Sequence, residues 1–445
     1  MAATDDRRRG RLVWRLARLA VWIFYRARRA GQPLPSGPVL LVANHPNSLM
    51  DPALVQITAG RLVRFLAKST LFHGHLLSVF IRSSGAIPVY RPIDPGVDTS
   101  RNVEMFRAVD AALAEGSALC LFPEGISHSE GRLTELRTGA ARIALQSEAN
   151  GVHVAIMPIG LNFDRASRFR SRAVVVFGRP FWCDDLLDEY RRAAPRAVRM
   201  LTDRIGEHLR TLLIEADPRS ELEIVHRVDR LYATARGVSR DPEDQFRRRR
   251  LIASGMGRLR QRDPVRYDDI RQRIMAYDAQ LTRFGLRDQD VGAGPAIGTV
   301  ITFSARELLM ALLLGPIALV AFVIFVVPYE MTAAVARRQR DLEVRATWVA
   351  VGGTFIYGVW VLALSLLAGQ LAGRGAGVVV FCALPLLAGA GLFAFEREAA
   401  VLTTVRAYLA MRQAPPRARA HLRRQRAEIA SVLEEVYAWL RQSGA

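Results

Sequence analysis

Short apolar runs alternate with amphipathic stretches between residues 38 and 181. Helical patterns lie near residues 52–60, 101–115 and 136–149, between runs with the length and composition of buried strands. Strands that alternate with helices of this length are typical of an α/β domain, which we predict over residues 36–183. The strand candidates are PVLLVANH, LVRFLAKS, FIRSSGAIPVY, ALCLFPEG, HVAIMPIGLNF and AVVVFGRPF.

The pattern becomes helical and very polar from residue 184 to residue 290. Amphipathic stretches such as PRAVRMLTDRIGEHLRTLLIEA and SELEIVHRVDRLYATARG have clear stops, and Pro218, Pro242 and Pro264 separate the segments. We predict a charged helical region here, followed by the linker DQDVGAGPAIG.

A membrane region is predicted over residues 291–400, where three apolar runs occupy residues 307–329, 348–369 and 377–395. Each run is about long enough to cross a hydrocarbon core of roughly 30 Å. Four arginines follow the first run, whereas a single arginine lies in the turn between the second and the third. Because positively charged loops stay in the cytoplasm, the second and third runs should form a transmembrane hairpin with an outside turn.

The first apolar run must then enter and leave on the cytoplasmic side. Gly315–Pro316 interrupts it, so we predict a re-entrant or half-immersed helical hairpin over residues 307–329. The alternative is three simple crossings, with the four-arginine loop on the outer side.

The two ends of the sequence are basic and helical in pattern. Residues 1–35 place tryptophan, leucine and isoleucine between arginines at roughly helical spacing and have no secretory signal pattern. This favours an amphipathic helix on the membrane surface, or a helix packed on the following domain. Residues 401–445 are predicted to form a basic C-terminal helix.

Composition adds a strong positive charge and a bias toward arginine. The net charge is +20, and Lys68 is the only lysine among 62 basic residues, as expected of a GC-rich bacterial genome. Such a charge suits the anionic face of a bilayer or nucleic acid. Cys120, Cys183 and Cys382 have no paired spacing, so we expect no disulfide framework and no metal site, and a reducing cytoplasm.

The stretch LLVANHPNSLMDPALV, residues 40–55, contains the first candidate chemistry. The residue before a proline avoids the right-handed helical region, so Asp51 is predicted to be a helix N-cap with Pro52 as the first helical residue. The same carboxylate could also accept a hydrogen bond from His45 Nδ1 and leave Nε2 as a base. The spacing alone leaves both interpretations open.

Three further stretches follow in order: GAIPVYRP, LFPEGISHSEGRLTELRTGAARIAL and IMPIGLNF. Together with the histidine–aspartate stretch they resemble the four motif blocks of the PlsC-like glycerolipid acyltransferase family. The resemblance implies an α/β fold with a mixed sheet flanked by helices, followed here by the helical region and the transmembrane helices.

The sequence departs from the commonest family pattern in one place. Five residues separate His45 from Asp51, where the family usually has four. The longer spacing with a following proline resembles the fungal-type glycerol-3-phosphate/dihydroxyacetone-phosphate acyltransferases. Looser similarity to that group continues through VHRVDRLYATARG, LTRFGLRDQDV and RRQRDLEVRATW.

The resemblance assigns roles to residues of the four blocks. His45, oriented by Asp51, is the expected base that removes a proton from the acceptor hydroxyl. Ser48 is a less favoured nucleophile. Arg91 is expected to bind the acceptor phosphate in a bidentate manner. Pro158, in the fourth block, is expected to shape a strand along an acyl tunnel.

The third block adds substrate contacts. Glu124 could hydrogen-bond a glycerol hydroxyl or pair with a nearby arginine, and Gly125 allows close backbone approach. Arg137 could add a second phosphate contact, and Lys68 is placed near the phosphate at the end of the second strand. His128 and His153 are expected to be satisfied polar residues.

These expectations combine into a membrane-bound O-acyltransferase of phospholipid biosynthesis. The donor would be an acyl-CoA or acyl-carrier-protein thioester with no other cofactor, and the acceptor glycerol 3-phosphate or dihydroxyacetone phosphate. One alternative is an enzyme that acylates lysophosphatidate or another lysophospholipid. The other is a non-enzymatic basic membrane scaffold, which could contact nucleic acid. For the enzyme we expect no nucleic-acid partner. The predicted location is the cytoplasmic face of a bacterial inner membrane.

Overall fold

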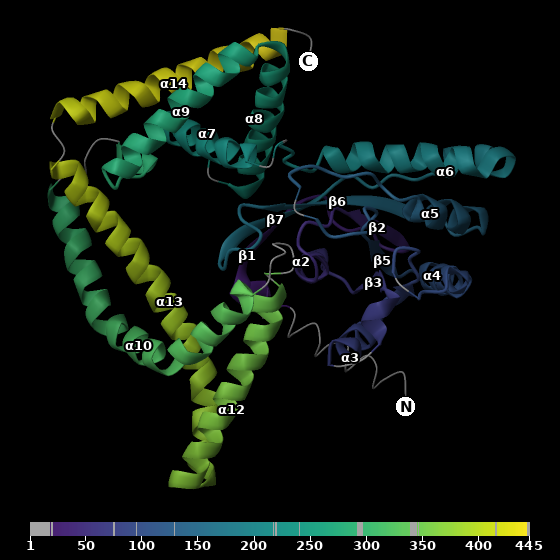
Figure 1. Cartoon of the computed structure of the whole chain (residues 1–445), viewed down its shortest axis with the longest axis horizontal. Helices are drawn as coiled ribbons and strands as arrows, with labels where there is room; N and C mark the ends of the chain where they lie inside the picture. Colours follow the sequence, from purple (N-terminus) through teal and green to yellow (C-terminus); the bar gives the residue numbers. More distant parts are fainter. Residues whose placement is uncertain are drawn as a thin grey trace. The chain divides into compact units, whose positions relative to one another are not determined.

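The computed structural model describes residues 18, 21–73, 76–94, 96–128, 130–216, 218, 220–239, 241–291, 297–338, 345, 347–413 and 416–442. These residues fold as two compact units, drawn together in Figure 1. The first takes its residues from 1–222, 241–250 and 339–350. The second takes its residues from 223–240, 251–338 and 351–445.

The first unit contains a seven-stranded mixed sheet with the strand order β1-β7-β6-β2-β5-β3-β4. Strands β6, β2, β5, β3 and β4 run parallel, whereas β7 is antiparallel to β6 and pairs in parallel with β1. The prediction of an α/β domain with a mixed sheet is confirmed. The strands are β1 (Tyr25–Gly31), β2 (Val39–Ala43), β3 (Val63–Lys68), β4 (Ile87–Val89), β5 (Ala118–Leu121), β6 (Ala155–Phe163) and β7 (Ser171–Phe177).

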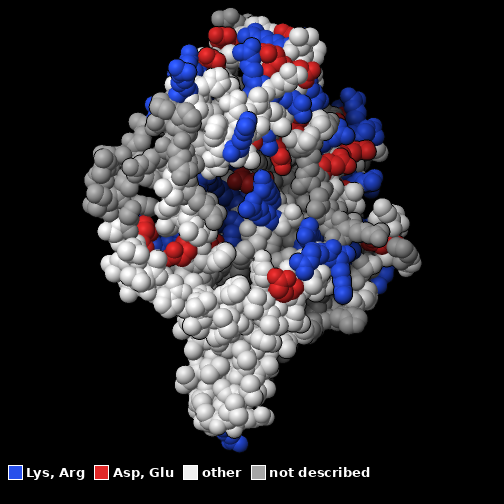
Figure 2. Space-filling view, turned by 60° about the vertical axis from the view of Figure 1, so that its left-hand side comes forward, with Lys and Arg blue, Asp and Glu red and all other residues white. Residues whose placement is uncertain are grey.

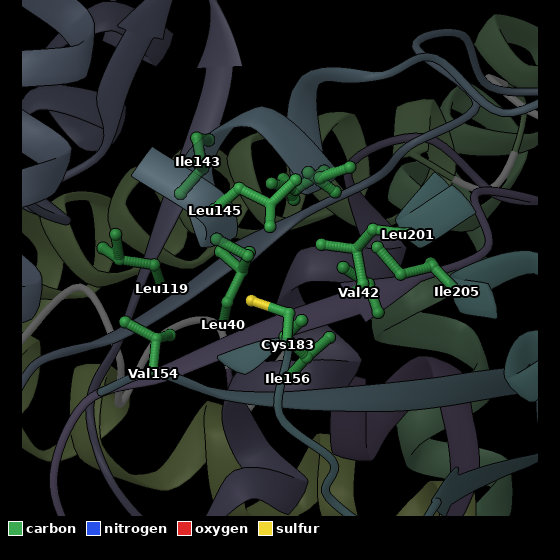
Figure 3. Packing of buried hydrophobic residues seen from close by; sticks show 14 of the residues in the cluster. Leu40, Val42, Leu119, Ile143, Leu145, Val154, Ile156, Cys183, Leu201 and Ile205 are labelled. Atoms are coloured by element: carbon green, nitrogen blue, oxygen red, sulfur yellow. The ribbon is translucent and has the colours of Figure 1, made fainter. Parts of the chain in front are cut away.

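Helices cover both faces of this sheet and make two hydrophobic cores. Every residue of β2 is buried, which is typical of a central parallel strand. Leu40 and Val42 share one core with residues of α4, α5 and α6, and Figure 3 shows them beside α5 and α6 residues. Leu41 and its neighbours pack toward α2. The helices of this unit are α2 (Met50–Ala59), α3 (Leu76–Ser83), α4 (Asn102–Ala114), α5 (Gly139–Ala149) and α6 (Leu187–Arg210), with short helices η1 (Ser69–Phe72), η2 (Thr99–Arg101) and η3 (Asp184–Leu186).

The structure corrects the secondary structure predicted for residues 1–35 and 80–90. Residues 25–31 form strand β1 instead of continuing the predicted helix of residues 1–35, because Tyr25 and Ala30 are buried while the strand pairs along β7. Most of that predicted helix lies outside the described residues. In FIRSSGAIPVY only the last part is a strand, and its first residues belong to α3, so β4 is much shorter than predicted.

The boundary predicted at residue 184 also differs from the structure. Helix α6 begins at Leu187 and buries Leu201, Ile205 and Leu209 in the same core as β2. Its strongly polar composition comes from the opposite, solvent-facing side, so the helix belongs to the α/β unit despite its charge.

The second unit is helical. Its helices are α7 (Glu221–Arg236), α8 (Pro242–Arg262), of which residues 251–262 belong here, α9 (Pro264–Arg283), α10 (Ile297–Arg337), α12 (Gly353–Ala372), α13 (Arg374–Gln413) and α14 (Pro416–Gln442), with η4 (Asp288–Val291); a π-helical turn, η5 (Trp348–Gly352), precedes α12. One core joins α7, α9 and α14, and another joins α10, α12 and α13. The basic helix predicted at 401–445 is divided between the end of α13 and α14.

Three helices of this unit are long and apolar enough to cross a membrane: Ala305–Arg337, Trp348–Ala372 and Arg374–Ala399. In Figure 2 the part formed by α12 and the start of α13 is an almost uncharged surface. The predicted break at Gly315–Pro316 is wrong, because α10 continues through it as one helix, which Figure 1 shows as a curved ribbon. A proline inside a helix removes one hydrogen bond and bends the helix without reversing the chain. That residues 307–329 enter and leave the membrane on one side stays a prediction.

Candidate active site

The predicted site residues of the first three blocks lie at one edge of the sheet. His45 follows β2, the Glu124-Gly125 turn follows β5, Lys68 ends β3 and Arg91 follows β4. These four strands are neighbours in the order β2-β5-β3-β4 and run parallel, so their carboxyl ends line up in that order. In α/β proteins this edge is where binding sites form.

The loop between β2 and α2 is held by its own polar side chains. Asn44 exchanges two hydrogen bonds with the backbone of Leu161 on β6, at 3.1 and 2.7 Å. Ser48 takes a positive φ of 47°, and its backbone N–H donates to Ser127 Oγ at 2.8 Å. This loop therefore connects the second strand to both the third block and the fourth.

The prediction that Asp51 is the N-cap of α2 is wrong. The helix begins at Met50, with Leu49 as its cap, and Asp51 lies in the first turn. Backbone hydrogen bonds from Met50 to Asn47 and from Asp51 to Ser48 start the helical turn two residues early. Asp51 is thereby turned toward the loop and away from the capping position.

His45 and Asp51 form a hydrogen-bonded pair. The Nδ1 atom of His45 lies 2.8 Å from Oδ2 of Asp51. The side chain of Asp51 is fully buried, whereas that of His45 is 19% exposed. An ionised carboxylate can only accept hydrogen bonds, so Nδ1 carries the proton and Nε2 is the basic nitrogen. Among the described residues, none hydrogen-bonds to Nε2.

Phe122 and Glu124 fix the position of His45 from the β5 side. The imidazole stacks on the ring of Phe122 with a centroid distance of 4.1 Å and an angle of 15° between planes. The backbone N–H of His45 donates to Glu124 Oε1 at 2.8 Å. The ring of His45 is therefore held by Phe122 as well as by Asp51, and Glu124 fixes its backbone.

Asp51 receives a second hydrogen bond from the backbone N–H of Asn47, at 2.7 Å. Burial raises the pKa of Asp51 above that of an ordinary aspartate, and the hydrogen bonds from His45 and Asn47 act against this rise. A buried carboxylate of this kind gains most from a cationic partner, so it favours the imidazolium that forms when His45 takes a proton.

Behind Asn47 lies a buried tyrosine. The Asn47 side-chain amide donates to Tyr25 Oη at 2.5 Å, and the Tyr25 hydroxyl in turn donates to the carbonyl of Ala166. Burial raises the pKa of Tyr25, so its hydroxyl stays protonated and keeps this donor role. Strand β1 thus supports the loop of the His45–Asp51 pair, a role that sequence reasoning missed because it assigned residues 1–35 to a helix.

Glu124 is a buried hub of the third block. Its Oε2 atom accepts hydrogen bonds from His128 Nε2 and from the backbone and hydroxyl of Thr134, the latter two at 2.9 Å. Burial by itself would raise the pKa of Glu124, but the hydrogen bonds from His128, Thr134 and His45 outweigh it, so the pKa is lowered. His128 is a satisfied polar residue, as expected, and its partner is Glu124.

Arg91 is held from two sides. Its Nε and Nη2 atoms donate to the two carboxylate oxygens of Asp94 at 2.9 and 2.6 Å, and Nη1 donates to the carbonyl of Gly125 at 2.5 Å. The last contact connects the second block directly to the third. Asp94 was not singled out from the sequence, since a carboxylate three residues after an arginine in a turn is a common arrangement.

Two further cations lie near this edge. Lys68 is exposed at the end of β3, and Arg137 is exposed just before α5, next to the turn of Gly125. Gly125 has a φ of +75°, which favours glycine, and a Cβ there would lie 3.4 Å from Arg137 Cγ. Within the part of the chain that the structure describes, neither Lys68 nor Arg137 has an ion pair within 4.0 Å.

Pro158 and His153 lie outside the cluster of predicted site residues. Pro158 is buried within β6 opposite Val42, and its carbonyl accepts from Gly178. His153 pairs with Glu148 at 2.8 Å and stacks on Trp182. Within the described ranges, no group of three or more His, Cys, Asp and Glu side chains is arranged to hold a metal ion.

Comparisons with known proteins match this part of the chain to acyltransferases. Residues 26–162 match the sequence profile of a family described as Acyltransferase. An uncharacterized acyltransferase of Schizosaccharomyces pombe is 28% identical over 271 residues, which are 59% of this chain and 39% of that protein. Glycerol-3-phosphate O-acyltransferase 1 of Saccharomyces cerevisiae is 31% identical over 189 residues, 41% of this chain and 25% of the yeast protein.

A plant protein is similar over a shorter region. A chloroplastic 1-acyl-sn-glycerol-3-phosphate acyltransferase of Arabidopsis thaliana is 25% identical over 147 residues, 32% of this chain and 39% of the plant protein. The chain spans less than two fifths of the length of each of these three relatives. The matched profile covers His45, Asp51, Arg91, Glu124 and Arg137. The chain therefore carries an acyltransferase-family domain at residues 26–162.

Proposed function

We propose that this protein transfers an acyl group from a thioester to a hydroxyl of glycerol 3-phosphate or dihydroxyacetone phosphate at a membrane. The observation that carries the proposal is the His45–Asp51 pair, with a 2.8 Å hydrogen bond to a fully buried carboxylate. A histidine oriented in this way presents Nε2 as a general base.

The reaction follows from that arrangement. Nε2 of His45 accepts the proton of the acceptor hydroxyl while the hydroxyl oxygen attacks the thioester carbonyl carbon. The tetrahedral intermediate collapses, the carbon–sulfur bond breaks, and the imidazolium returns its proton to the leaving thiolate. Asp51 stabilises the imidazolium throughout, and no covalent acyl-enzyme is needed.

The acceptor phosphate is assigned to the cationic end of the same edge. Arg91 and Arg137 lie against the Gly125 turn, and Lys68 ends the neighbouring strand β3. Their positive charges favour an anionic acceptor. Glu124 serves mainly to hold His45. Among the described residues its Oε1 atom accepts one hydrogen bond, from the backbone of His45, so it can accept another from an acceptor hydroxyl.

The three apolar helices support a membrane location for the reaction. A long acyl chain and the acylated product are both poorly soluble in water, so an enzyme attached to a bilayer meets and releases them there. The relatives compared above come from yeasts and a plant, so they do not support the bacterial origin predicted from the arginine bias.

Relatives favour two different acceptors. The yeast relative is named a glycerol-3-phosphate acyltransferase, whereas the plant relative is named for 1-acylglycerol 3-phosphate. The yeast match is the more extensive one, and the five-residue spacing between His45 and Asp51 resembles the fungal type. Lysophosphatidate is therefore the second candidate acceptor.

The test is a side-by-side assay with labelled acyl-CoA. Purified protein in lipid nanodiscs is offered glycerol 3-phosphate, dihydroxyacetone phosphate and lysophosphatidate at equal concentration. We expect the highest kcat/KM with one of the first two. A preference for lysophosphatidate would move the assignment to the second candidate, and transfer to none of the three would refute the proposal. Acyl-carrier-protein thioester, run in parallel, tests whether the basic protein of net charge +20 uses that acidic carrier.

A further inference from the structure

The guanidinium assigned to the acceptor phosphate already holds a carboxylate. Asp94 takes the side of the Arg91 fork formed by Nε and Nη2, with both oxygens at hydrogen-bond distance. This pair is mostly shielded from solvent, with the side chain of Arg91 24% exposed and that of Asp94 12% exposed. A bidentate phosphate contact would use a fork of the same kind.

Asp94 lies in the field of a second cation. Lys68, at the end of β3, pairs in register with Val89 of the parallel strand β4. Val89 lies two residues before Arg91 in the sequence. The hydrogen bonds from Arg91 lower the pKa of Asp94, and the charges of Arg91 and Lys68 lower it further. Asp94 is therefore a carboxylate throughout the neutral range, and it cancels one of the positive charges at this end of the edge.

We propose that Asp94 is a resident anion in the acceptor subsite, and that the acceptor phosphate binds by replacing the Asp94 carboxylate on Arg91. This inference rests on the proposed function, because it takes Arg91 as the phosphate contact.

Two further contacts indicate that the Asp94 carboxylate can leave Arg91 and does not merely hold the guanidinium in place. The carbonyl of Gly125 holds Nη1 of Arg91 at 2.5 Å and keeps the guanidinium at the Glu124-Gly125 turn when Asp94 leaves. Asp94 lies in a backbone turn closed by a hydrogen bond from its own N–H to the carbonyl of Arg91. Rotation of its side chain is then enough to clear the fork, and the backbone can stay in place.

The exchange makes the subsite selective for charge. A phosphomonoester dianion brings two negative charges to Lys68, Arg91 and Arg137, so it competes well against one carboxylate. A phosphodiester brings a single negative charge and has little advantage over Asp94. Asp94 therefore favours glycerol phosphates with a free phosphomonoester over lysophospholipids that carry a headgroup, and it weakens the binding of both.

The test compares Asp94→Asn with Asp98→Asn in the full-length protein. Asp98 lies in the same loop, is exposed and caps η2 through Ser100, so its substitution removes the same charge without touching Arg91. Two quantities are measured: the Kd of inorganic phosphate without acyl donor, by calorimetry, and the KM for glycerol 3-phosphate with acyl-CoA.

For Asp94→Asn we expect both constants to fall by about three- to fivefold, the upper part of the range for a partly exposed ion pair, with kcat little changed. Asp98→Asn should leave both constants within about twofold of the wild type, since an exposed charge is strongly screened. The preference for glycerol 3-phosphate over a lysophosphatidylcholine acceptor should also shrink in Asp94→Asn. Tighter binding cannot result from a misfolded variant.

Unchanged or weaker phosphate binding in Asp94→Asn would overturn the inference and make Asp94 a support of Arg91. An equal gain in Asp98→Asn would also overturn it, because the effect would then be one of overall charge. If phosphate binding tightens but no variant transfers an acyl group, the proposed function fails while the assignment of Asp94 as resident anion stands.

Discussion

Different kinds of interaction stabilise the interior of each of the two units of this protein. At the sheet edge of the α/β unit, polar groups form a chain of hydrogen bonds that runs from Tyr25 through Asn47 and Asp51 to His45. In the three apolar helices, large apolar side chains such as Phe325 and Leu384 pack together, and small residues make close contacts between helices. A Cβ on Gly391 of α13 would lie 2.2 Å from the Ala321 side chain of α10.

One polar contact in these helices compensates for a hydrogen bond that a proline removes. Pro328 has no N–H for the carbonyl of Ile324 one turn earlier, and the indole N–H of Trp360 on α12 donates to that carbonyl at 2.9 Å. Glu307 joins α10 to α13 through Arg397 at 2.6 Å. The comparison teaches that catalysis needs a network that fixes orientation, whereas a membrane unit needs backbone groups satisfied and helices closely packed.

The largest expected effect concerns Asp51. Asp51→Asn keeps the size of the side chain but cannot hold the protonated Nδ1 of His45 as a carboxylate does. We expect the rate of acyl transfer to fall by about 10²–10⁴-fold while the fold is retained. Circular dichroism checks the fold, and Asp188→Asn, at an exposed position of α6, is the matched control. A rate within threefold of the wild type would show that Asp51 does not orient the base.

A second effect is on stability and its dependence on pH. Glu124→Gln replaces the carboxylate that binds His128 and Thr134 with a neutral amide. This should lower the free energy of unfolding by about 3 kcal/mol at pH 7. Because the pKa of Glu124 is lowered in the folded protein, its contribution is full above the unfolded value of 4.5 and is lost as pH falls through the lower, folded value.

The stability difference between wild type and Glu124→Gln should therefore shrink in acid. Denaturant unfolding at a series of pH values below neutrality measures it, with Glu130→Gln, an exposed acid of the same loop, as the control. A difference that stays constant down to pH 3 would contradict the role given to the charge of Glu124.

In the membrane helices we expect a smaller loss from a steric change. Gly391→Leu forces the side chain into Ala321 and should destabilise the packing of α10 against α13 by about 1–3 kcal/mol. Gly389→Leu is the matched control, since a Cβ at Gly389 meets nothing within 4 Å. Thermal unfolding in detergent compares the two, and equal stability of both variants would argue against this contact.

The smallest effect is expected for Trp360→Phe. This change keeps the aromatic ring but leaves the carbonyl of Ile324 without its donor, at a cost of about 0.5–1 kcal/mol in a membrane helix. Trp348→Phe, at a tryptophan that is 45% exposed, serves as the control in the same assay. An identical unfolding midpoint for both variants would mean that the indole hydrogen bond contributes nothing measurable.

Much of the site could be predicted from sequence because its parts follow strand ends. The runs that became β2 and β5 are continuous and apolar, and His45 and Glu124 follow them. The run of β3 is interrupted by Arg64 and ends at Lys68. Neighbouring parallel strands bring residues at their carboxyl ends together, and this does not depend on the conformation of the loops. The order of the four blocks then gave the remaining assignments.

The parts that were missed depend on contacts between distant residues. Strand β1 has the sequence YRARRAG, in which arginines dominate, and only pairing with β7 identifies it as a strand. The same holds for Tyr25, whose partner Asn47 lies 22 residues away. Pro316 was read as an interruption, but in an apolar helix of this length one missing hydrogen bond is too small a defect to end it.

The most direct test of the central claim is the rate of acyl transfer in His45→Ala, measured beside Ser48→Ala in the same lipid preparation. Direct attack by the acceptor, with His45 as base, predicts a loss of about 10²–10⁴-fold for His45→Ala and a rate within a few-fold of the wild type for Ser48→Ala. Undiminished transfer by His45→Ala, or abolished transfer by Ser48→Ala with labelled acyl-enzyme in the wild type, would contradict the account.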